Sequence, residues 1–134
     1  MQPSSGATQP AEFRLVLSPD TEAGWRTRQA LRQRFSESLP ARALIDLTAV
    51  VTELVNHAVA EGPQRPITVS LVVDDKMIRG EVADQGNPAA SIPQDPEAKR
   101  KAPLALQVVQ QLTSRWGVYE GSTHVWFELP LEAS

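Results

Sequence analysis

Alternation of apolar and polar residues predicts the strands of this chain. The first predicted strand covers 12–17, where Phe13, Leu15 and Leu17 form one apolar face and alternate with Glu12, Arg14 and Val16. Two runs rich in β-branched residues, 67–73 and 77–83, are separated by three polar residues and predict an antiparallel hairpin. A second hairpin is predicted from 116–120 and 124–129, around a Gly-Ser turn.

Apolar residues spaced three or four apart predict three helices, at about 21–38, 41–60 and 104–114. Pro40 ends the first helix, and Gly62 followed by proline ends the second. The expected core residues are Trp25, Ala30, Leu31 and Phe35 in the first helix, Leu44, Leu47, Val51, Leu54, Val55 and Ala58 in the second, and Leu106, Val108, Val109, Trp116, Val125 and Phe127 nearer the C-terminus.

The order of these elements predicts an α+β fold. Strands joined mostly by hairpins, with helices free to gather on one face, favour a two-layer sandwich of three helices on a mixed, mainly antiparallel sheet. We expect a disordered tail at 1–10 and a single domain at 11–134. The proline-rich segment 85–103 is long for a loop in a compact domain, which is typical of a lid or binding loop; a surface excursion without a function is the alternative.

Composition narrows the function classes. Of 134 residues, 41% are hydrophobic and 22% charged, and the chain shows neither a secretion signal nor an uninterrupted apolar run of about 18 residues. We therefore expect a cytoplasmic protein that does not bind membranes. The absence of cysteine excludes disulfides, and a net charge of -3 does not favour nucleic acid. Four arginines in the first helix are interpreted as its solvated face: Arg26, Arg28, Arg32 and Arg34.

Polar residues interrupt the apolar second helix. Glu53, His57 and Glu61 are each four residues apart and lie along one edge of this helix. A simple Glu53–His57 pair is one interpretation. A metal site is disfavoured, because only one of the three side chains offers nitrogen, and we predict no bound metal.

Five segments together resemble the GHKL (Bergerat-fold, histidine kinase-like) ATPase domain, and within it the anti-sigma-factor serine kinases. They are Glu-Leu-Val-Asn-His-Ala-Val at 53–59, Asp-Gln-Gly-Asn-Pro at 84–88, Pro-Leu-Ala-Leu at 103–106, Ser-Arg-Trp-Gly at 114–117 and His-Val-Trp-Phe-Glu-Leu at 124–129. The resemblance covers nearly the whole chain after the tail. It implies a transcription regulator that phosphorylates a STAS-domain antagonist, sequesters a sigma factor by partner switching, and pairs as a homodimer through a sheet edge and the first helix.

The resemblance also implies roles for particular residues. Glu53 corresponds to the general base, and Asp84 to the aspartate that binds the adenine amino group; Asp84 as a turn cap is the alternative. His57 occupies the position of the asparagine that carries magnesium, and imidazole is a poor ligand for that ion. Asn56 lies one residue early, about 100° around the helix, and could replace it only if the helix shifted register.

The phosphate-binding glycines of the family are mostly replaced. Gly86 remains, whereas Pro88, Pro103 and Ala105 stand at the other three positions. Glycine lets backbone amides approach phosphate oxygens, and proline has no amide hydrogen to donate. We therefore predict a regulatory protein that acts mainly by protein binding, with impaired or lost ATP binding and no cofactor beyond weak Mg-ATP. The alternatives are an active ATP-dependent serine kinase and a domain that binds a different small ligand.

Overall fold

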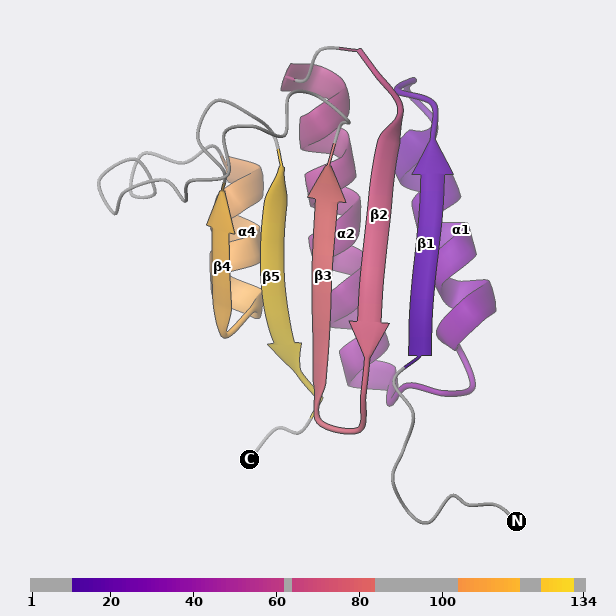
Figure 1. Cartoon of the computed structure of the whole chain (residues 1–134), viewed down its shortest axis with the longest axis vertical. Coiled ribbons are helices and arrows are strands. Elements are labelled where there is room, and N and C mark those ends of the chain that lie inside the picture. Colours follow the sequence, from indigo (N-terminus) through magenta and orange to yellow (C-terminus); the bar gives the residue numbers. More distant parts are fainter. Residues whose placement is uncertain (1–10, 62–63, 84–103, 119–123, 132–134) are drawn as a thin grey trace.

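A computed structural model describes residues 11–61, 64–83, 104–118 and 124–131 of the chain. Its strands form one antiparallel sheet in the order β1-β2-β3-β5-β4. All three described helices cover the same face of that sheet, which confirms the predicted α+β two-layer fold (Figure 1). The elements are β1 (Ala11–Leu17), α1 (Ala23–Phe35), α2 (Ala41–Glu61), β2 (Ile67–Val73), β3 (Met77–Ala83), α4 (Leu104–Leu112), β4 (Arg115–Val118) and β5 (Val125–Pro130).

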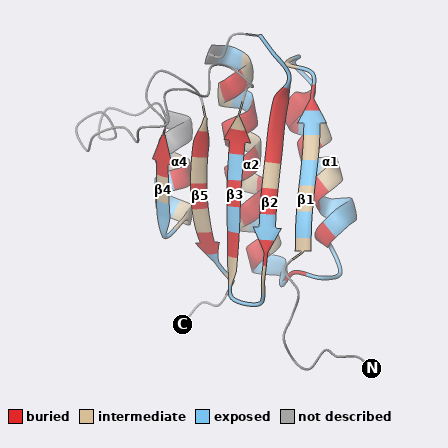
Figure 2. Ribbon diagram, viewed as in Figure 1, coloured by how far each residue is buried: buried red, intermediate tan, exposed pale blue. Residues whose placement is uncertain are grey.

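The core lies between the sheet and the helices. Strand residues alternate between buried positions that face the helices and more exposed positions on the open face, as Ile78 and Arg79 do (Figure 2). On the open face, Glu128 pairs with Arg79 at 3.3 Å and with Arg115 at 3.6 Å. The largest fully buried side chains are Phe35, Phe127, Leu31, Leu47, Leu54, Ile67, Leu71, Ile78, Val50, Val51, Val55 and Val69.

The stripe predicted for α2 is largely correct, since five of its six residues are buried. Leu44 is only half-buried, and Val50, which the prediction missed, is fully buried. By length and composition alone, Ala41–Ala60 could cross a membrane. The buried stripe instead packs on the sheet, so the apolar composition of α2 is accounted for by its place in the core.

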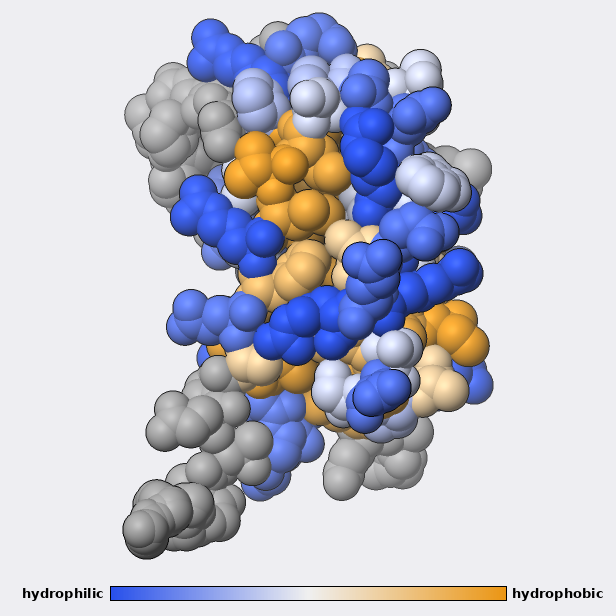
Figure 3. All heavy atoms as spheres, turned by 90° about the vertical axis from the view of Figure 1, so that its right-hand side faces the viewer, coloured by the Kyte–Doolittle hydropathy of each residue, from blue (hydrophilic) through white to orange (hydrophobic). Residues whose placement is uncertain are grey.

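The prediction that Trp25 faces the core is wrong, because 57% of this residue is exposed. Trp25 lies about 120° around the helix from Leu31, so the two side chains cannot share the buried face. Leu31 and Phe35 are buried as predicted, together with Thr27. Trp25 instead lines a shallow recess beside β1. Figure 3 shows the side of the molecule formed by β1 and α1, where an apolar area is bordered by hydrophilic side chains.

Aspartates define two of the turns. Asp74 accepts backbone N–H bonds from Lys76 and Met77, both at 2.8 Å, and these bonds lower the pKa of its carboxyl group. Asp20 accepts the N–H of Glu22 before α1, and this bond and a side-chain bond from Arg26 lower its pKa. Helix α1 begins at Ala23 and α4 ends at Leu112, so both helices are shorter than predicted. The predicted tail 1–10, the lid 85–103 and the Gly121-Ser122 turn lie outside the described residues.

Candidate functional site

Helix α2 presents a polar row to α1. Thr48, Thr52 and Asn56 follow one another at four-residue spacing, so they lie on one side of α2. The corresponding row on α1 consists of Gly24, Arg28 and Arg32. Because Gly24 meets Asn56 while Arg28 and Arg32 share a recess with Thr48 and Thr52, the two rows run antiparallel along the seam between the helices.

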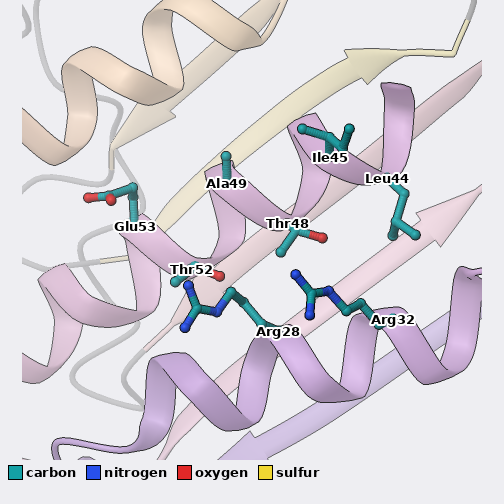
Figure 4. Close-up of a pocket in the computed structure, with 8 residues that line it drawn as sticks. All are labelled: Arg28, Arg32, Leu44, Ile45, Thr48, Ala49, Thr52 and Glu53. Atoms are coloured by element: carbon teal, nitrogen blue, oxygen red, sulfur yellow. The ribbon is translucent and has the colours of Figure 1, made fainter. Parts of the chain in front are cut away.

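The wide part of this seam is a recess of about 400 Å³. Figure 4 shows the side chains of Arg28 and Arg32 extending from α1 toward α2, where Thr48 and Thr52 face them. The Thr52 hydroxyl is buried and has no hydrogen-bond partner among the described residues. The residues that line the recess are Arg28, Arg32, Leu44, Ile45, Thr48, Ala49, Thr52 and Glu53.

Asn56 closes the narrow part of the seam. Its Oδ1 lies 2.5 Å from the point that a Cβ on Gly24 would occupy, so the side chain lies directly against the backbone of α1. Asn56 is thus turned toward α1, whereas His57 lies about 100° further around α2. Helix α2 runs without interruption from Ala41 to Glu61, so Asn56 and His57 keep their helical spacing.

The contact between Gly24 and Asn56 can be measured as a coupling energy. Alanine is favoured over glycine inside a helix by about 1 kcal/mol, so Gly24→Ala should stabilise an Asn56→Ala background by about that amount. In the wild-type background the Asn56 amide must move, and we expect the gain to be smaller by about 0.5 kcal/mol or more. Urea unfolding of the four proteins measures the difference, and equal effects in both backgrounds would contradict the contact.

Glu53 and His57 each lie about 100° around α2 from Thr52 and Asn56, the residues that precede them, and both are half-buried. In Figure 4 the carboxylate of Glu53 points away from the two guanidinium groups. Among the described residues no ion pair joins Glu53 to His57, so a simple pair between them is not supported. Within the described part of the chain, no group of three or more acidic or histidine side chains is placed to hold a metal ion.

The rest of the predicted nucleotide site lies beyond the described structure. Asp84 and Gly86 are outside the described residues, as are Pro88 and Pro103. Ala105 belongs to α4, but its side chain is outside the description. The structure therefore places Glu53, Asn56 and His57 on one helix and separates Asn56 from the other two by its contact with α1.

Sequence reasoning missed the recess because it treated four arginines as one solvated face. Arg26 instead binds Asp20 at 2.6 Å, and the guanidinium of Arg34 lies 4.9 Å from the ring centre of Phe35. Only Arg28 and Arg32 line the recess. One signal in the sequence could have distinguished Arg28 and Arg32 from the other two arginines. They are four residues apart, as are Thr48 and Thr52 on α2.

Comparison with known proteins supports the fold and leaves the chemistry open. A crystal structure of the RsbU and RsbW domains of a Mycobacterium tuberculosis protein matches with a TM-score of 0.65 and 19% sequence identity. The match covers 90% of this chain and 31% of the other, so this chain spans about a third of the length of that solved chain. No family model matches, and no curated protein matches. The fold is therefore RsbW-like.

Proposed function

We propose that this protein is a partner-switching regulator of the anti-sigma-factor type, which acts in the cytoplasm by binding proteins and has impaired or lost ATP binding. The RsbW-like fold supports the class. The observation that carries the loss of ATP binding is the contact of Asn56 with Gly24. Because the Asn56 side chain is held against Gly24, its amide is not available to replace the magnesium ligand that is missing at position 57.

The chemistry of the remaining positions agrees with this proposal. Magnesium prefers oxygen ligands in octahedral geometry, and His57 offers only imidazole nitrogen. Prolines 88 and 103 can donate no amide hydrogen to phosphate, and a Cβ at Ala105 restricts close approach of the backbone. An active serine kinase is the alternative. Glu53 favours it, because a half-buried carboxylate stands where the family has its general base.

Binding measurements with purified sigma factors and STAS-domain proteins from the same cell test the proposal. We expect one of them to bind, with an affinity that Mg-ATP and Mg-ADP leave unchanged. Incubation with ATP should leave the STAS protein unphosphorylated, as measured by intact-protein mass spectrometry. Phosphorylation of a STAS serine that is abolished by Glu53→Gln would instead establish the kinase, and absence of binding to every sigma and STAS protein would remove the proposed class.

We further propose that the protein forms a homodimer through β1 and α1. Among the described strands, β1 is an edge of the sheet with one unpaired side. Val16 is 55% exposed and Trp25 is 57% exposed, and both line the recess beside this edge. Two such apolar residues at an open strand edge are suited to a symmetric interface.

A charge placed on this surface should dissociate the dimer. We expect sedimentation velocity to show a dimer for the wild type and a monomer for Val16→Asp/Trp25→Glu, because both carboxylates would be buried against the partner copy. Val72→Asp is the matched control, since Val72 is also exposed but lies on β2, outside the recess that Val16 and Trp25 line. A wild-type monomer at 100 μM, or equal dissociation by Val72→Asp, would contradict the assignment.

A further inference from the structure

We infer that the recess between α1 and α2 binds an acidic amphipathic helix of a partner protein. The inference rests on the proposed function only in assuming that a protein partner exists. Its occupant is defined by chemistry: two carboxylates one helical turn apart, followed along the same face by aliphatic side chains. Three features of the recess point to this occupant.

The first feature is uncompensated positive charge. Arg28 and Arg32 are exposed, lie one helical turn apart, and form no ion pair with any described residue. Glu53 lines the recess but is turned away from them, and Asp46 on the same helix is paired with Arg42. Cβ atoms four residues apart on a helix are separated by about 5–6 Å, so two such guanidinium groups match carboxylates with the same spacing on another helix.

The second feature is the unsatisfied hydroxyl of Thr52. A buried hydroxyl without a partner destabilises the protein, and a ligand that supplies an acceptor removes that penalty. Thr52 and Thr48 face the two arginines across the recess (Figure 4). A carboxylate held by the arginines is therefore within a site that also offers hydroxyl donors.

The third feature is the apolar end of the same recess. Ile45 is 64% exposed, and it lies beside the half-buried Leu44 and Ala49. A large aliphatic residue with this exposure is an anchor point for a helix laid into the groove between two others. Because the apolar and basic parts adjoin along the seam, the occupant must be both acidic and apolar, which distinguishes it from nucleic acid.

A designed peptide tests the recess directly. The probe is an 18-residue helical peptide with glutamates four residues apart and leucines one turn further along the same face. A second probe is the same peptide with the glutamates replaced by glutamine. A third is a 12-nucleotide oligo-dT. In ¹⁵N-correlated NMR spectra of the full chain, we expect the acidic peptide to shift the amides of Thr48, Thr52 and Ile45, and the glutamine peptide to bind at least about tenfold more weakly.

Variants of the two arginines complete the test. Arg28→Glu/Arg32→Glu should weaken acidic-peptide binding by at least about tenfold, and the milder Arg28→Gln/Arg32→Gln variant should do the same if the first fails to fold. Arg65→Glu is the control, because Arg65 is exposed between α2 and β2 and lines neither this recess nor the one beside β1. Equal loss with Arg65→Glu, shifts elsewhere on the protein, or oligo-dT binding as tight as the peptide would overturn the inference.

The outcome is separable from that of the proposed function. If a sigma or STAS protein binds and the arginine variants leave that binding unchanged, the recess is not the docking site, whereas the proposed function stands. If the acidic peptide binds at the recess but no sigma or STAS protein binds the chain, the recess inference stands and the proposed class fails.

Discussion

Replacing Gly80 with alanine is expected to lower the free energy of unfolding by about 1–3 kcal/mol, or more if the core cannot adjust. A Cβ at this position of β3 would stand 2.6 Å from Cε2 of Phe127 and 2.8 Å from Cδ2 of Leu71, and it would also clash with Cζ of Phe127. Both neighbours are buried and cannot move into solvent. The substitution therefore overpacks the centre of the sheet.

The sign of this effect separates two physical causes. Backbone entropy alone would make Gly80→Ala stabilising by about 0.4–1 kcal/mol, so a stabilised variant would contradict the packing described for β3. Ser70→Ala on the open face of β2 is the control, and we expect a change within about 0.5 kcal/mol. Replacing the ring of Phe127 with the smaller leucine side chain should recover part of the lost free energy of unfolding. A double-mutant cycle measured by urea unfolding tests this.

The second large effect is expected from restoring the family's nucleotide-binding residues. The variant His57→Asn/Pro88→Gly/Pro103→Gly/Ala105→Gly returns an oxygen ligand for magnesium and three positions at which backbone amides can approach phosphate. We expect Mg-ATP affinity to rise by at least about tenfold over the wild type, which corresponds to about 1.4 kcal/mol. Calorimetry measures this gain, and an unchanged affinity would show that the loss has another cause.

A control identifies which amide serves the restored site. In the fourfold variant, Asn56→Ala should leave nucleotide affinity unchanged, because the Asn56 side chain lies against Gly24 of α1. If Asn56→Ala instead removes the regained affinity, then Asn56 is the magnesium ligand. That result would contradict the orientation described for α2.

The sheet could be predicted from sequence because its signals are local. The bounds of β2 and β3 agree with the predicted 67–73 and 77–83, since alternation and the Asp74 turn are both encoded within a few residues. Helical spacing already places Trp25 about 120° around α1 from Leu31, so the sequence shows that the two cannot share one face. Which of these two faces lies against the sheet depends on packing and is not encoded within α1.

The candidate site was predictable only in part. Glu53 and His57 share an edge of α2, as their four-residue spacing implies. The contact of Asn56 with Gly24 depends on how α1 and α2 cross, so no spacing within α2 alone could show it. The recess also depends on how the two helices pack, because Arg28 and Arg32 on α1 form it together with Thr48 and Thr52 on α2.

The most direct test of the central claim is titration calorimetry of the wild-type protein with ATP and with ADP, each with magnesium. The claim is that an RsbW-like fold here binds proteins with its nucleotide site impaired or lost. It predicts no measurable heat, and no shift in melting temperature, at nucleotide concentrations up to about 1 mM, the limit that corresponds to about 4.1 kcal/mol of binding free energy. Binding in the micromolar range would contradict it.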